Sequence, residues 1–339
     1  MKELRDKLAA AEKKQLRKPR VEDLEWKRIP IPPSRIKIVN YTREKPLVAF
    51  NPGALFKKGK LEIFPRLIFD YHLYVSSIGR FEVELDNIAD SEEEFETEII
   101  LAPEELWEFR GCEDPRIIEI KEGYAILYTG FGYQARGNGF EPVVVQGFAL
   151  LNSEFKPTRK GFIRILGRDE DYISPLKDSA FIEYGRRSPF LTRPEVGGVS
   201  AGWWGVLNLE DLTINAEDMK PVLFPEKWEL KVGWSTNTVK IGFNEYLVGW
   251  HAIHKETNAY LNGFCLISDD GRLLAVSDYL LAPKLLWEKY GDRPHVIFGN
   301  GLVLVKDTLY WVGGVSDYAI GIYSIELDKI LEKLKWIEG

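Results

Sequence analysis

The 339-residue sequence has little of several residues on which whole classes of proteins depend. Two cysteines cannot supply a disulfide framework, and neither they nor the four histidines show the spacing of metal ligands, so we expect no metal. No apolar run approaches the roughly 18 residues that a membrane-spanning helix needs. The start, MKELRDKLAAAEKK, lacks the apolar core of a secretory signal, and we therefore expect a cytoplasmic protein.

An excess of basic residues is also missing. The net charge is -7, and the lysines and arginines are interspersed with acidic residues, so neither nucleic acid nor an anionic membrane is an expected partner. No glycine-rich loop opens a predicted helix, which leaves a nucleotide cofactor without support. What the sequence does have is aromatic material, with 10 Trp and 18 Phe, and a hydrophobic content of 45% that suffices for a large packed core.

A unit of about 60 residues occurs five times along the chain. Each copy has a polar or proline-bearing opening, an apolar strand, a tight turn and a second apolar or aromatic strand, which is the pattern of a β-hairpin. The five copies begin at Phe50, Asp114, Lys177, Ser235 and His295. Further strand patterns lie between the copies, so each period holds about four strands.

Four-stranded sheets repeated around an axis form a β-propeller. We therefore predict an all-β fold, a five-bladed β-propeller with short N- and C-terminal helices. Residues 1–30 are expected to be an N-terminal helical extension, and residues 31–339 the catalytic propeller with its C-terminal helix. Leu4, Leu8 and Ala11 line one face of the first helix. That apolar stripe could cover the propeller or join the subunits of a homo-oligomer, and the sequence does not choose between the two.

The first strand of a propeller blade begins, and its hairpin partner ends, on the same face, so these positions of the repeats meet at the axial channel. An excess of Arg, Lys and His there is unexpected in a protein of net negative charge, and it fits a small anionic ligand such as phosphate. Each residue alone has a simpler explanation, such as a turn, an ion pair or a core histidine, whereas the set does not. The residues concerned are Asn51, Asp114, Arg116, Lys177, Asp178, Ser235, Asn237 and His295 from the openings, and Arg66, Arg193, His251 and Asp317 from or just beyond the second strands.

The run Glu113-Asp114-Pro115-Arg116 resembles the signature of glycoside hydrolase family 130, the inverting β-mannoside phosphorylases and their hydrolytic relatives, which are five-bladed propellers. Supporting matches are Asn51-Pro52-Gly53, Lys177, Arg193-Pro194, Trp250-His251 with Tyr260, and Asp317 in the segment 313–321. The sequence departs from the family pattern at VGWSTNTVK, at HVIF, which brings in His295, and around Arg66 in FPRL. The resemblance therefore implies least about which glycosidic linkage is cleaved and which acceptor sugar is used. We expect the chain to belong to an atypical subgroup of the family.

The resemblance also implies roles for individual residues. Asp114 is the implied general acid. The implied phosphate-binding residues are Arg66, Lys177, Arg193 and His251. The predicted substrate-binding residues are Asn51, Glu113, Arg116, Tyr260, His295 and Asp317.

An inverting hydrolase needs an acid on one side of the scissile bond and a second carboxylate that activates water on the other. A phosphorylase needs only the acid, because phosphate is itself the nucleophile and cations hold it in line. The hydrolytic relatives replace basic phosphate ligands with acids, whereas this chain keeps Arg193 and His251.

The predicted function is therefore inverting phosphorolysis of a β-mannoside, a mannobiose or manno-oligosaccharide, to α-mannose 1-phosphate and a shortened acceptor. Inorganic phosphate is the co-substrate, and no cofactor is expected. One alternative is an inverting β-mannosidase with Glu113, Glu229 or Asp317 as the base. The other is a non-catalytic carbohydrate-binding propeller.

Overall fold

The computed structural model describes residues 2–11, 14–22, 24–85, 88 and 93–337, and in them the chain is built mainly of β-strands. The prediction of an all-β fold is confirmed. No helix in these ranges has the length and apolar character to cross a lipid bilayer. The helical elements are α1 (Lys2–Ala10), α2 (Leu286–Lys289), α3 (Leu327–Leu331) and the 3-10 turns η1 (Pro33–Arg35) and η3 (Leu106–Glu108).

All five predicted hairpins form as antiparallel strand pairs. Their connecting turns include residues of positive φ such as Lys58 and Asn244, as tight hairpin turns require. The pairs, in chain order, are β3 (Val48–Lys57) with β4 (Lys60–Ile68), β7 (Gly111–Ile120) with β8 (Gly123–Arg136), β12 (Leu176–Phe181) with β13 (Arg187–Val196), β18 (Glu229–Gly242) with β19 (Glu245–His254), and β22 (Ile297–Val305) with β23 (Thr308–Val315).

Further strands extend each hairpin outward. They are β5 (Ser76–Glu84), β6 (Phe95–Leu101) and β2 (Ile36–Ile38) on the first; β9 (Gly139–Leu151) and β10 (Pro157–Phe162) on the second; β11 (Arg164–Leu166), β14 (Val199–Ser200), β15 (Gly202–Asn208), β16 (Thr213–Asn215) and β17 (Lys220–Leu223) on the third; β20 (Tyr260–Ile267), β21 (Leu273–Val276) and β25 (Lys335–Trp336) on the fourth; and β24 (Ala319–Glu326) and β1 (Lys27–Ile31) on the fifth. Hydrogen bonding joins the strands into sheets of four, nine, seven and five strands. The nine-stranded sheet holds the first two hairpins, and its β5 and β7 meet in one residue pair, Ser76 and Gly111.

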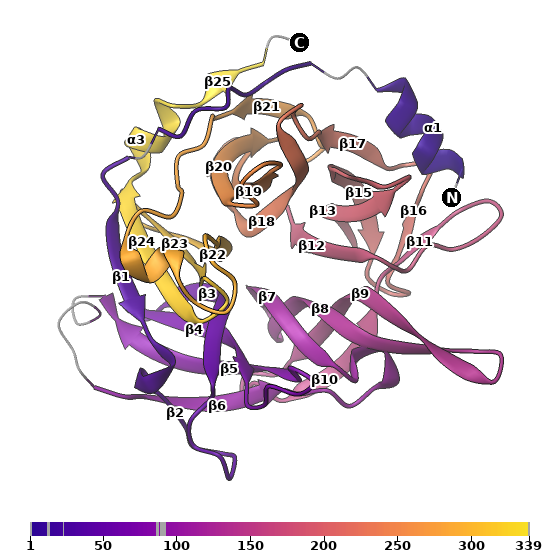
Figure 1. The fold of residues 1–339 in the computed structure, drawn as a ribbon. Coiled ribbons are helices and arrows are strands. Elements are labelled where there is room, and N and C mark those ends of the chain that lie inside the picture. The colour runs from indigo at the N-terminus through magenta and orange to yellow at the C-terminus, as the bar shows by residue number, and fades with distance from the viewer. Residues whose placement is uncertain (1, 12–13, 23, 86–87, 89–92, 338–339) are drawn as a thin grey trace.

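The sheets lie around a common centre, with the first strand of each hairpin innermost (Figure 1). β3 contacts both β7 and β22, and β18 contacts both β12 and β22. Large apolar side chains, among them Phe64, Phe148 and Phe190, are fully buried in the clusters within and between the sheets. Burying a side chain of this size stabilises the fold by roughly 1.5–3 kcal/mol. The packed sheets therefore hold the inner strands, and the residues on them, in fixed positions.

The N-terminal part of the chain runs over the outside of the last three hairpin units (Figure 1). Leu4 and Leu8 of α1 are buried in the apolar cluster of the third unit, so the apolar stripe covers the protein's own core. β1 pairs with β24 of the fifth unit, and the predicted domain boundary at residue 30 lies inside this strand. The C-terminal helix is shorter than its sequence periodicity indicates. It ends at Leu331, and β25 pairs with β21 instead of continuing the helix.

Candidate active site

A β-bulge interrupts the first strand of every hairpin at an equivalent place. The strand registers shift between Phe50 and Gly53, Glu113 and Arg116, Lys177 and Ala180, Trp234 and Thr238, and Gly299 and Gly301. In the first three bulges Asn51, Asp114 and Asp178 have φ values of 44°, 51° and 53°. Asn and Asp tolerate this left-handed conformation better than most residues, and a bulge re-aims the side chain that it carries. The local sequence thus turns polar side chains toward the centre of the ring.

These side chains line a cavity of about 220 Å³. Nine of the eleven predicted site residues are among those that line it. The lining residues are Asn51, Arg66, Glu113, Asp114, Lys177, Asp178, Arg193, Lys231, His251, Tyr260, Arg293, Val296, Phe298 and Asp317.

A larger hollow of about 640 Å³ lies near the turns of the first two hairpins, at the ends of the inner strands away from the bulges. Charged side chains line it, but several of them already pair with one another. Lys57 pairs with Glu119, and Arg80 pairs with Glu62 and Glu82. The smaller central cavity, where unpaired charges remain, is therefore the better candidate for an active site.

One side of the central cavity is acidic. Arg66 donates to Glu113 Oε1 over 2.7 Å and to Asp114 Oδ1 over 3.4 Å. The amide of Asn51 donates to the same Asp114 oxygen over 2.9 Å. Burial raises the pKa of Asp317 to about 6, although Arg66 acts in the opposite direction. Burial likewise raises the pKa of Glu113. Three carboxyl groups thus gather around a single arginine.

A second group of side chains in the cavity, here called the basic side, centres on one buried carboxylate, Asp178. Its Oδ2 accepts from Arg193 Nε over 2.7 Å and lies 3.8 Å from His251 Nε2, and its Oδ1 accepts from Arg116 Nη2 over 3.5 Å. Burial alone would raise the pKa of Asp178, but the two arginines hold it far below its ordinary value. Burial lowers the pKa of His251 well below its usual range, so His251 is a neutral hydrogen-bonding group. This corrects its inclusion among the cations.

Three further cations line the cavity and form no ion pair with any residue that the structure describes. They are Lys177, Lys231 and Arg293. Burial, together with the charges of Arg193 and Lys177, lowers the pKa of Lys231 to about 7. Burial is the larger cause, and the neighbouring positive charges act in the same direction. The basic side therefore carries more positive charge than Asp178 can balance, as an anion-binding site requires.

The close approach of Arg193 and His251 depends on Gly233. A Cβ atom at this position would lie 2.4 Å from Cδ of Arg193 and 3.1 Å from Cε1 of His251. Only glycine leaves that space to the arginine. Gly233 belongs to VGWSTNTVK, so one of the departures from the family pattern shapes the basic side.

Two predicted site residues lie outside the lining of the cavity. Arg116 is buried, donating to the backbone carbonyls of Ser235 over 2.8 Å and of Asp114 over 2.9 Å, so it ties the Asp114 bulge to the fourth hairpin. His295 is exposed, and its backbone carbonyl accepts from the amide of Tyr260 over 3.1 Å.

Sequence reasoning did not single out Lys231, Arg293 or Asp178 as site residues, although it placed Asp178 in the ring. Asp178 occupies the same place in the bulge of the third hairpin as Asp114 does in the second, so the bulge position would have identified it. Lys231 lies four residues before its strand's bulge residue Ser235, and Arg293 lies in a loop before β22, so no repeat position indicates either one. Their placement follows from tertiary structure alone.

A carboxyl group beside an arginine and a separate group of cations in one small polar cavity can donate a proton and bind an oxyanion, as glycosyl transfer to an oxyanion requires. The comparisons with known proteins agree. The family model described as beta-1,4-mannooligosaccharide phosphorylase matches residues 15–336, so the chain belongs to glycoside hydrolase family 130, the family of mannoside phosphorylases.

Two curated relatives come from Thermoanaerobacter sp. (strain X514). The 1,2-beta-oligomannan phosphorylase is 27% identical over 293 residues, which are 83% of this chain and 90% of the relative. The beta-1,2-mannobiose phosphorylase is 27% identical over 300 residues, which are 83% of this chain and 91% of the relative. Among solved structures, the beta-1,2-mannobiose phosphorylase of Listeria innocua with beta-1,2-mannobiose aligns with a TM-score of 0.67 at 17% identity, covering 90% of this chain and 98% of that one. This structural likeness supports the fold.

Proposed function

We propose that the protein cleaves a β-linked mannobiose or manno-oligosaccharide with inorganic phosphate and inverts the anomeric carbon, giving α-mannose 1-phosphate and a shortened acceptor. One observation carries the proposal. Glu113 and Asp114 pair with Arg66 in one part of the cavity, whereas Arg193 and the unpaired Lys231 lie by Asp178 in another. This arrangement separates a proton donor from an oxyanion site, as phosphorolysis requires.

In the proposed mechanism Asp114 is the general acid. It protonates the glycosidic oxygen, directly or through a hydroxyl group of the sugar, as the bond to the acceptor breaks. A phosphate oxygen attacks the anomeric carbon from the opposite face, so the new bond forms with inversion. Asn51 and the backbone contact of Arg116 hold Asp114 in place. The contacts of Arg66 favour a role in holding Glu113 and Asp114 rather than phosphate.

The phosphate site would combine Lys177 and Arg193 with Lys231 and Arg293, and neutral His251 would donate a hydrogen bond. The Oγ of Ser235 lies 3.0 Å from His251 Nδ1, which fixes the ring and leaves Nε2 to face the cavity side of Asp178. The mannosyl ring would contact Asn51, Glu113, Tyr260 and Asp317, which line the cavity. His295 is exposed, and we propose no sugar contact for it.

Among the residues that the structure describes, no carboxylate in or near the cavity suits the hydrolytic alternative as a base. An inverting hydrolase places its two carboxyl groups about 6.5–9.5 Å apart on opposite sides of the bond. Glu113 shares Arg66 with Asp114, and the pKa of Asp317 responds to the same arginine, so both lie on the acid's own side. Glu229 does not line the cavity and is bound by Arg17. Asp178 is held by two arginines, which leaves it a poor base for water.

We further propose that the fold is a five-bladed propeller and that residues 31–339 form one catalytic domain. The five equivalent bulges support five blades, the nine-stranded sheet counting as two blades that share one residue pair. A cytoplasmic location is supported by the two free, buried cysteines. A homo-oligomer remains part of the proposal, and its contacts would not use the buried stripe of α1. Phosphate would be the co-substrate and no cofactor would be needed.

Incubation with β-1,2-, β-1,3- and β-1,4-linked mannobioses, with and without phosphate, tests the function. We expect α-mannose 1-phosphate only when phosphate is present, and fastest from the β-1,2-linked sugar, on which two relatives are named to act. Free mannose formed at the same rate without phosphate would instead establish a hydrolase. No turnover of any of the three sugars would favour a binding protein.

A further inference from the structure

Three loops that lead into inner strands share a tryptophan–glutamate pair after a proline. The sequences are PEELWE at 103–108, PEKWE at 225–229 and PKLLWE at 283–288. The three glutamates, Glu108, Glu229 and Glu288, are at most 2% exposed. Each accepts hydrogen bonds from backbone amides of its own loop, such as that of Glu226 to Glu229 over 2.7 Å. The three carboxylates therefore fix the shape of the loops that deliver the inner strands.

A buried carboxylate also needs a positive partner. Lys160 of the adjacent strand β10 supplies it for Glu108. For Glu229 and Glu288 the partners are Arg17 and Arg28, which come from the distant N-terminal segment, residues 14–22 and 24–31. The N-terminal segment thus completes two of the three loops.

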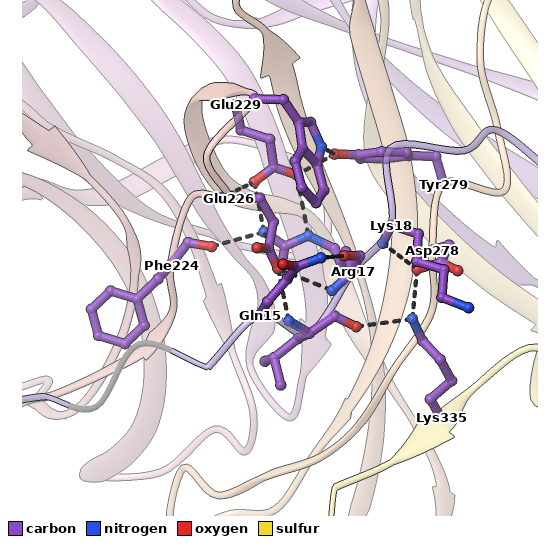
Figure 2. Close-up of polar contacts among 11 residues, drawn as sticks. Gln15, Arg17, Lys18, Phe224, Glu226, Glu229, Asp278, Tyr279 and Lys335 are labelled. Carbon is purple, nitrogen blue, oxygen red and sulfur yellow. Dashed lines mark hydrogen bonds and ion pairs between the residues drawn. The ribbon is translucent and has the colours of Figure 1, made fainter.

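Arg17 is completely enclosed by its partners (Figure 2). Its Nε donates to Glu229 Oε1 over 3.1 Å and its Nη2 to Glu229 Oε2 over 2.6 Å. Nη2 also donates to the carbonyl of Phe224 over 2.7 Å, and Tyr279 donates its hydroxyl to Glu229. The guanidinium carbon lies 4.8 Å from the ring centre of Trp250. The planar fork of arginine satisfies all these contacts at once, which lysine cannot do.

Both groups that Arg17 holds are neighbours of the proposed phosphate site. Glu229 begins β18 and lies two residues before Lys231, with a register shift between them. Trp250 directly precedes His251 on β19. A displacement of either group would move a side chain that lines the cavity.

Arg28 holds the loop before β22 in a comparable way. Its Nη1 lies 2.6 Å from Glu288 Oε1, and the carbonyl of Glu288 accepts from Ser316 Oγ over 3.0 Å. The carbonyl of Ser316 accepts from the amide of Arg293 over 3.0 Å. Asp317 follows Ser316 directly. The chain of contacts thus runs from Arg28 to two residues that line the cavity.

We propose that Arg17 and Arg28 are positioning residues of the N-terminal segment. Arg17 sets the part of the cavity that holds Lys231 and His251, and Arg28 sets the part that holds Arg293 and Asp317. This inference rests on the proposed phosphorolysis. Neither arginine lines the cavity, so each acts through its glutamate. Another ion pair of the same segment, Glu22 with Lys333, is partly exposed and its partners do not contact the cavity lining in any described interaction. It offers a matched control.

Arg17→Lys keeps the positive charge and removes the fork. We expect it to raise KM for phosphate about tenfold while KM for mannobiose stays within about twofold, because only the basic side shifts. Calorimetry with inorganic phosphate alone should show the same loss of affinity. Glu22→Gln, the control, should match the wild type in both measurements. Arg28→Lys should show a smaller loss, since Arg293 lies at the end of a longer chain of contacts.

A second variant distinguishes loss of positioning from loss of folding. Arg17→Met combined with Glu229→Gln removes both charges, so no buried carboxylate is left unpaired, and it should show the same selective loss. A folded variant with wild-type affinity for phosphate, an equal change in kcat and both KM values, or failure of both variants to fold would overturn the positioning role. A wild-type protein that neither requires nor binds phosphate would instead overturn the proposed function, and this inference with it.

Discussion

Asp114→Asn is expected to lower kcat for phosphorolysis of mannobiose about 10³-fold, because a general acid contributes about 10²–10⁴-fold to glycosidic bond cleavage. The amide keeps the shape of the carboxyl group and can still accept from Asn51 and Arg66, so the fold and the phosphate site should persist. Release of α-mannose 1-phosphate at saturating mannobiose and phosphate measures the effect.

Two controls distinguish loss of proton donation from other causes of lost activity. A dinitrophenyl β-mannoside has a leaving group that needs no proton, so the Asn variant should cleave it at a rate close to that of the wild type. Glu113→Gln alters the other partner of Arg66 and should affect KM for mannobiose more than kcat. Full activity of Asp114→Asn on mannobiose would remove Asp114 from the mechanism.

Lys231→Met is expected to lower kcat/KM for phosphate about 10²-fold, which is typical for loss of one group that stabilises transition-state charge. Lys231 has no ion pair among the described residues, so its removal leaves no buried partner unpaired and the protein should fold normally. KM for mannobiose should change little. Unchanged phosphate kinetics would show that the anion lies elsewhere.

The pH dependence of phosphate affinity provides a further test of the role of Lys231. The pKa of Lys231 is lowered to about 7 by burial and by Arg193 and Lys177, so the free enzyme loses this charge as pH rises through that value. Phosphate affinity of the wild type should therefore weaken above pH 7. Lys231→Arg stays charged and should give a flatter profile, and the titration of phosphate itself is common to both enzymes.

The sequence predicts the hairpins well because their signals are local. Alternating apolar residues and turn residues mark each strand pair, and the period near 60 residues repeats them five times. The inward-facing residues follow from the same periodicity, since a bulge at one place in each hairpin turns Asn51, Asp114 and Asp178 to the centre. Seven of the nine predicted site residues that line the cavity belong to these repeat positions, whereas Glu113 and Tyr260 were predicted only through the family resemblance.

Other features depend on contacts between distant segments and left no local signal. The charges separate into an acidic and a basic side because of which residues the ring brings together, as Arg66 with Glu113 and Arg193 with Asp178. The neutral state of His251 follows from its burial. Arg17 lies in a highly charged stretch that is typical of a solvated surface, yet it is fully buried against Glu229.

The most direct test of the separated charges is a crystal structure with inorganic phosphate bound. We predict that the phosphate oxygens lie within hydrogen-bonding distance of Arg193 and Lys231, with Asp114 on the far side of the mannosyl position. A phosphate bound at Arg66 between Glu113 and Asp114, or outside the central cavity, would contradict the account.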